Sequence, residues 1–167
     1  MGGSKDYLIK IIEYCQDKDI PITLFVSPMD NLRLVSTMGY DLYVDQIKGI
    51  AKEYGIEFYD FNLVKDEYLP VYQGGYFSDS GHMNSSGAEI FTPFFAKVVS
   101  GDYSENEKYF YSSYAEKLER EAPSLYGIYY RELETMKTFW IASNRNSGME
   151  SVLLLRERQK VRMKYRP

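Results

Sequence analysis

The only histidine of the chain, His82, follows Asp79 by three residues. An unperturbed imidazole has a pKa of about 6.5, so near neutral pH it can both accept and release a proton. A carboxylate at this spacing, across a tight Ser-Gly turn, can reach the ring and hold one ring nitrogen protonated, which leaves the other nitrogen free as a base. Asp79 and His82 therefore supply two of the three members of a catalytic triad. The non-functional alternative is a surface histidine that lies beside an aspartate by chance.

A metal-binding role for His82 is the weaker functional alternative. Structural zinc needs about four nitrogen or sulfur ligands and catalytic zinc about three protein ligands. The chain has one histidine and one cysteine, Cys15. We therefore expect no metal site and no cofactor, and a single cysteine excludes an intrachain disulfide.

The third member of a triad, a nucleophile, is not evident. Ser27 and Ser36 follow the first expected strand, and Ser78 and Ser80 flank the aspartate. A nucleophile must hydrogen bond to the base and lie beside donors that stabilise an oxyanion. We interpret these residues as ordinary loop serines and assign no nucleophile.

The elements before the turn alternate between helix and strand. Apolar spacing predicts a helix over residues 5–18 and another through residues 42–51, the second ended by Gly55. Short apolar runs predict buried strands over residues 22–26 and 56–61. Helices between strands require crossover connections, so the sequence predicts an α/β fold with parallel strands.

A long loop over residues 62–81 leads to the Asp79–His82 turn, and a helix follows it. Asn84, Ser85 or Ser86 can cap this helix, and the spacing from Ser86 to Glu89 fits a capping box. A capped helix would give the histidine a rigid mount. The residues expected to face the core from this helix are Ile90, Phe94, Phe95 and Val98.

The character of the chain changes beyond residue 100. Residues 105–121 read as a charged helix ended by Pro123, within a helical connector over 101–123. We expect a small β-rich extension over 124–167. Its predicted strands are 124–130, 137–143 and 151–155, the last of which could instead be helical.

The order of these features resembles the C-terminal half of an SGNH (GDSL-type) hydrolase over residues 5–100. The shared features are a strand ending in Ser27-Pro28, the strand around residues 58–61, the Asp79-to-His82 motif, and the continuation through Asn84 and Gly87. The continuation is similar to envelope-associated relatives, which include acyltransferases and acetyltransferases acting on cell-wall or exopolysaccharide material. The resemblance implies part of a flavodoxin-like, three-layer α/β/α sandwich. It also implies that His82 is the general base and Asp79 its orienting carboxylate.

The resemblance covers one of the four blocks of that family. The chain has no Gly-Asp-Ser nucleophile motif, no Gly-x-Asn-Asp block and no Gly-x-Ser-x-Gly elbow. In the family these blocks precede the strand equated with residues 22–26. We therefore expect the nucleophile to lie upstream of Met1, in an esterase or O-acyl(acetyl)transferase. We also expect this chain alone to be inactive.

Charge and hydropathy limit the partners. The formal net charge is −4, which gives no reason to expect nucleic-acid binding, and no apolar run is long enough for a membrane span. The resemblance implies an acylated small molecule or carbohydrate as substrate and a cell-envelope or extracellular location, although the chain shows no export signal. Loss of the preceding strands would expose the edge of the 22–26 strand, so self-association is expected.

A non-catalytic binding module is the alternative function. The expected β-rich extension carries four large aromatic side chains, which could contact a glycan or a partner protein or could form a small core beneath a hairpin. These residues are Tyr129, Tyr130, Phe139 and Trp140.

Overall fold

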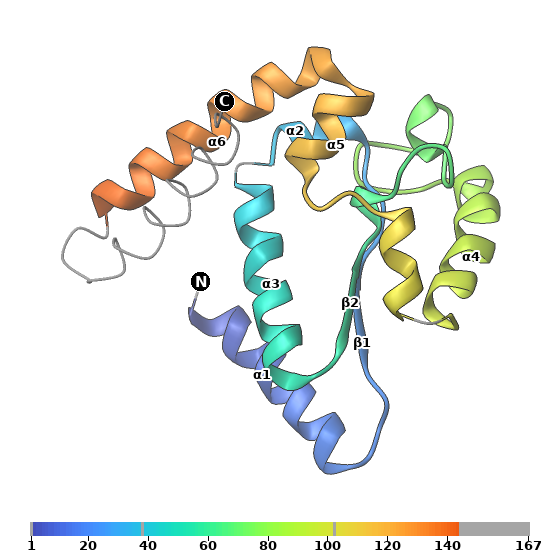
Figure 1. The fold of residues 1–167 in the computed structure, drawn as a ribbon, viewed down its shortest axis with the longest axis vertical. Coiled ribbons are helices and arrows are strands. Elements are labelled where there is room, and N and C mark those ends of the chain that lie inside the picture. The colour runs from blue at the N-terminus through green and yellow to red at the C-terminus, as the bar shows by residue number, and fades with distance from the viewer. Residues whose placement is uncertain (1, 38, 102, 144–167) are drawn as a thin grey trace, which may run out of the picture.

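The computed structural model describes residues 2–37, 39–101 and 103–143, so the strand expected over 151–155 lies outside the described residues. The fold is mostly helical with a small parallel sheet (Figure 1). Its helices and strands are α1 (Gly2–Asp17), β1 (Thr23–Val26), α2 (Asn31–Val35), α3 (Tyr40–Tyr54), β2 (Glu57–Asp60), α4 (Ser85–Val99), α5 (Tyr114–Glu121) and α6 (Pro123–Ser143).

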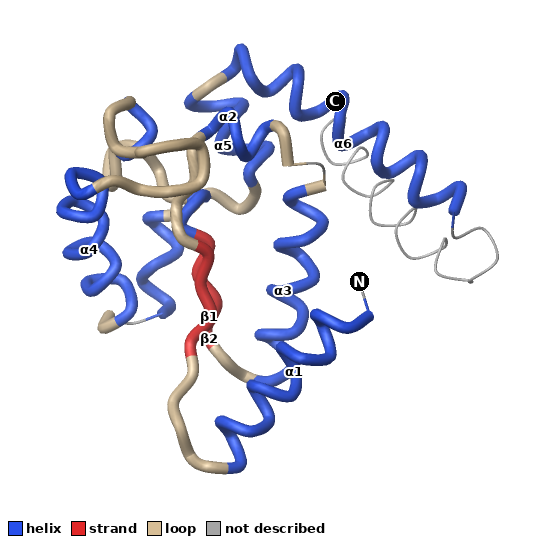
Figure 2. Tube along the Cα trace, turned by 180° about the vertical axis from the view of Figure 1, so that it is seen from behind, coloured by secondary structure: helices blue, strands red, loops and turns tan. Residues whose placement is uncertain are grey.

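The two strands pair in parallel, as the sequence predicts. The register runs from Thr23 opposite Glu57 to Val26 opposite Asp60. The crossover between them contains α3, which packs on β2. Helices α1 and α3 lie on one side of the sheet and α4 on the other (Figures 1 and 2). The carboxyl ends of both strands therefore open toward the same loops.

Helix α3 shows how the local sequence sets these elements. Its buried face includes Val44, Ile50 and Ala51, which recur at helical spacing. It ends at Gly55, whose φ of 64° is left-handed and whose N–H bonds back to the carbonyls of the last turn. Glycine adopts this conformation without the steric cost that a β-carbon brings, so the predicted helix end is confirmed.

The predicted helix over residues 105–121 is interrupted. A 3₁₀ segment covers Tyr103–Tyr109, and the chain then runs extended before α5 begins. The extended part pairs with the segment after β2: the Tyr111 N–H donates to the Leu63 carbonyl at 2.8 Å and the Lys65 N–H to the Tyr109 carbonyl at 2.9 Å. These backbone hydrogen bonds replace those that a continuous helix would form.

The prediction of a β-rich extension is wrong for residues 124–143, which are the part of it that the structure describes. The predicted strands over 124–130 and 137–143 both lie in helix α6. Proline is favoured at the first position of a helix, where its missing N–H costs nothing, and Pro123 begins α6. Tyr129 is buried against the Tyr114 ring, with centroids 5.1 Å apart. Tertiary packing therefore overrides the β-propensity of the aromatic run.

Strand β1 pairs with β2, and no other strand pairs with it among the described residues. The extension cannot cover its second edge as a strand over residues 123–143, because that segment is helical. Phe25 of β1 is half exposed. Self-association through this edge stays a prediction, as does the division of the chain near residues 100 and 123. Among the described helices, none is long and apolar enough to cross a membrane.

Candidate active site

The structure brings Asp79 and His82 together as the sequence predicts. Nδ1 of His82 lies 2.9 Å from Oδ1 and 2.8 Å from Oδ2 of Asp79. The carboxylate accepts, so this contact places the proton of a neutral ring on Nδ1. The His82 side chain is 81% exposed. Its second nitrogen, Nε2, is therefore left as the basic position and is accessible to a group that approaches from solvent.

The backbone of the turn holds the carboxylate in place. Oδ1 of Asp79 accepts the N–H of Gly81 at 2.8 Å and the N–H of His82 at 2.9 Å. The Ser78 N–H closes the turn onto the His82 carbonyl at 2.8 Å. The Gly81 N–H, followed by the His82 ring, lowers the pKa of Asp79 below its ordinary value of 3.8. Asp79 is therefore a carboxylate at every pH at which the imidazole could act as a base.

The turn lies at the carboxyl end of the sheet. The N–H of Asp30, in the loop after β1, donates to the Ser80 carbonyl at 3.3 Å. A cleft of about 320 Å³ opens between this loop and the 71–80 segment, with Val71, Tyr72 and Phe77 as its apolar wall and Asp30, Asp79 and Ser80 on its polar side. Open α/β sheets bind ligands in crevices at this edge.

Comparison with known proteins gives no family for this chain. No family model matches it, nor does any curated protein or solved structure.

Helix α4 provides the rigid mount. Asn84 is its N-cap: its side-chain oxygen accepts the Gly87 N–H at 2.9 Å, and its side-chain nitrogen donates to the Gly75 carbonyl at 2.7 Å. The capping box predicted from Ser86 to Glu89 is wrong, because Asn84 is the cap and Gly87 takes the third helical position. The predicted core face is confirmed, with Val98 fully buried and Ile90, Phe94 and Phe95 packed against the core.

Gly87 matters because the cap brings the backbone of the preceding loop close to it. A β-carbon at this position would overlap the Tyr76 carbonyl oxygen and the Met83 side chain. The same β-carbon at Gly49, inside α3, would meet no atom within 4 Å. The two glycines therefore form a matched pair in two helices of equal length.

Gly87→Ala should lower the free energy of unfolding by about 1–3 kcal/mol, because overpacking outweighs the helix preference of alanine. Gly49→Ala should raise it by about 0.5–1 kcal/mol, since only the helix preference acts there. Urea denaturation of both variants measures the difference. If Gly87→Ala were more stable than the unmodified chain, the loop before α4 would have to move readily to accommodate the β-carbon. Helix α4 would then not hold the turn of His82 rigidly.

A buried polar network behind the cleft was missed by sequence reasoning. The Asp60 carboxylate, at the end of β2, accepts the Tyr40 hydroxyl at 2.8 and 2.9 Å and the Asn62 N–H at 3.0 Å. The Asn62 side chain accepts the Met29 N–H at 2.7 Å and donates to the Ser27 carbonyl at 3.2 Å. Burial raises the pKa of Asp60, and the hydrogen bonds from Tyr40 and Asn62 oppose this increase. The network therefore fixes the loop after β1, next to the turn of His82.

The remaining candidate residues do not gather at His82. Within the described ranges, no serine hydroxyl hydrogen bonds to its ring, and no group of three or more His, Cys, Asp or Glu side chains could hold a metal ion. Of the four tail aromatics, Tyr129 is buried, Tyr130 is 46% exposed, and Phe139 and Trp140 lie within α6. The hairpin surface predicted for glycan binding is therefore absent from residues 124–143.

Proposed function

We propose that this chain carries the general base and the orienting carboxylate of a serine esterase or O-acyltransferase of the SGNH type, acting on ester-linked acyl groups of a carbohydrate. The supporting observation is the contact between the Asp79 carboxylate and Nδ1 of an exposed His82. A ring held in this way presents Nε2 as a base that can take the proton of a hydroxyl nucleophile. The partial flavodoxin-like sandwich belongs to the same proposal.

Each residue has a defined role in this reaction. His82 accepts the proton of the attacking hydroxyl through Nε2 and returns it to the leaving oxygen of the ester. Asp79 stabilises the imidazolium that forms in between and stays ionised throughout. The cleft beside Asp79 and Ser80 offers an apolar wall to the acyl part of a substrate.

In this proposal, the nucleophile and the oxyanion donors are supplied by polypeptide outside residues 1–167. A serine would have to approach Nε2 of His82 within about 2.6–3.2 Å in the reacting complex. The chain by itself should therefore hydrolyse p-nitrophenyl acetate at a rate close to the background.

The test uses the longest natural polypeptide that contains this chain. His82→Ala should lower kcat/KM for p-nitrophenyl acetate hydrolysis by about 10²–10⁴, which is the range that general-base catalysis contributes. The matched control is Ser78→Ala, in the same exposed turn but outside the cleft lining, where only the backbone N–H makes the contact to the His82 carbonyl. It should leave kcat/KM unchanged. Full activity of His82→Ala, or no esterase activity in the unmodified polypeptide, would refute the proposal.

A further inference from the structure

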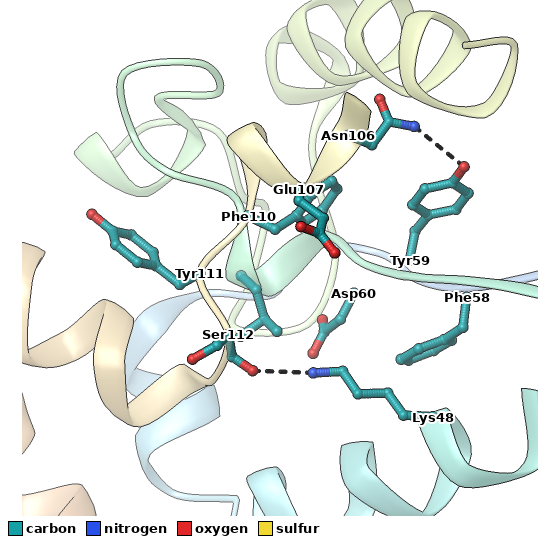
Figure 3. A pocket seen from close by; sticks show the side chains of 10 residues that line it. Lys48, Phe58, Tyr59, Asp60, Asn106, Glu107, Phe110, Tyr111 and Ser112 are labelled. Atoms are coloured by element: carbon teal, nitrogen blue, oxygen red, sulfur yellow. Dashed lines mark hydrogen bonds between the residues drawn. The ribbon is translucent and has the colours of Figure 1, made fainter. Parts of the chain in front are cut away.

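A second pocket, of about 450 Å³, lies beside β2 and shares no lining residue with the cleft at Asp79. Three consecutive strand residues, Phe58, Tyr59 and Asp60, line it. Successive strand side chains point to opposite faces, so a pocket lined by all three lies at the edge of the strand. Its other wall is the segment over residues 106–112 (Figure 3). The volume is within the range of about 300–1,000 Å³ found for pockets that hold small ligands.

The charges in the pocket have both signs. The carboxylates of Asp60 and Glu107 and the ammonium of Lys48 point toward one another across it (Figure 3). The Lys48 ammonium also donates to the Ser112 carbonyl at 3.1 Å. A cation that entered would meet Lys48, and an anion would meet both carboxylates. This arrangement therefore disfavours an ionic ligand of either sign.

A neutral ligand with many hydroxyl groups matches the same wall. Lysine offers donors and a carboxylate offers acceptors, so Lys48 can donate to the hydroxyl groups of such a ligand and Glu107 can accept from them. The aromatic rings of Phe58 and Phe110 provide apolar surface between these polar groups. A sugar ring has this composition, with hydroxyl groups at its rim and C–H groups on its faces.

The aromatic wall is fixed before any ligand arrives. The Asn106 side chain is buried and donates to the Tyr59 hydroxyl at 3.3 Å and to the Val98 carbonyl at 2.9 Å. The rings of Tyr59 and Phe110 lie 6.2 Å apart and are tilted by 32°. Groups that are already ordered lose little conformational entropy on binding, which favours affinity.

We propose that the pocket between β2 and residues 106–112 is a binding site for a neutral sugar unit of a glycan, separate from the Asp79–His82 site. This binding function is additional to the proposed esterase or acyltransferase activity, because the pocket binds the sugar without reacting with it. Its role is to hold a glycan chain on the protein. Binding can therefore be measured without any catalytic activity.

The test is a titration of the ¹⁵N-labelled chain, followed by backbone amide signals. N-acetylglucosamine and methyl β-D-glucopyranoside are the sugar probes, and choline and acetate are the ionic comparators. We expect at least one sugar to shift the amide signals of Phe58, Tyr59 and Phe110 at millimolar concentration, and the ionic compounds to leave them unchanged. The proposal is overturned if neither sugar shifts these signals, or if choline or acetate shifts them more.

A matched pair of variants tests the placement. Glu107→Gln replaces one of the two carboxylates of the pocket with a neutral amide and should raise the Kd of the sugar about tenfold, because a hydrogen bond to a charged acceptor is roughly twice as strong as one to a neutral acceptor. Glu105→Gln lies in the same 3₁₀ segment, outside the pocket lining, and should leave the Kd unchanged. Equal affinity in both variants would show that the sugar binds elsewhere. His82→Ala should also bind normally, which separates this proposal from the catalytic one.

Discussion

Asp79→Asn should lower the kcat of the proposed acyl transfer by about 10⁴ and change the tautomer of His82. The carboxylate makes two kinds of contact: Oδ1 accepts the N–H groups of Gly81 and His82, and both oxygens accept from Nδ1 of the ring. In asparagine the remaining oxygen can keep the two backbone hydrogen bonds. The new amide group then donates to Nδ1, which moves the ring proton to Nε2. A ring protonated at Nε2 cannot accept the proton of a nucleophile.

The tautomer can be measured on this chain alone, because it contains a single histidine. With ¹⁵N-labelled histidine, the neutral ring of the unmodified chain should carry its proton on Nδ1, and that of Asp79→Asn on Nε2. Ser80→Ala is the control for the turn and should retain the Nδ1–H form. An unmodified ring that is protonated mainly on Nε2 would contradict the assignment of Asp79 as the orienting group.

Local sequence predicts the Asp79–His82 pair because every contact that forms it lies within four residues. The Gly81 turn, the Asn84 cap and the helix after it are all read from short-range spacing. The same holds for α1, α3 and both strands, whose apolar periodicity decides their conformation. Gly55 marks the end of α3 through the same kind of local rule.

The Asp60 network could not be predicted in this way. Its hydrogen bonds join Tyr40 to Asp60 across 20 residues and Met29 to Asn62 across 33. The sequence does offer one signal for this network: two polar residues, Asp60 and Asn62, stand at the end of a predicted parallel strand. The strand predictions within residues 124–143 failed for a related reason. The contacts of Tyr129 are with residues distant in sequence: its ring packs on that of Tyr114, and its hydroxyl accepts the Asp41 N–H.

A buried lysine beneath the cleft should have the largest effect on stability. Lys117, on α5, is 2% exposed, and its ammonium donates to the Val64 carbonyl. It lies 3.3 Å from the Asp66 carboxylate, 3.6 Å from that of Glu121, and 3.7 Å from the centre of the Tyr72 ring. Tyr72 lines the cleft beside Asp79. Burial lowers the pKa of Lys117, and the two carboxylates oppose this decrease.

Lys117→Ala should lower the free energy of unfolding by about 3–5 kcal/mol, because it removes a buried cation from two partly buried carboxylates, whose side chains are 27% and 17% exposed. Arg120→Ala is the control on the same helix: its ion pair with Glu116, at 3.3 Å, is exposed, and its loss should cost at most about 1 kcal/mol. Urea denaturation measures both. A triple variant, Lys117→Met with Asp66→Asn and Glu121→Gln, should regain most of the loss, since no buried charge then remains unpaired. If Lys117→Ala cost no more than Arg120→Ala, the ammonium would have to be solvated, and α5 could not be packed beneath the cleft as described.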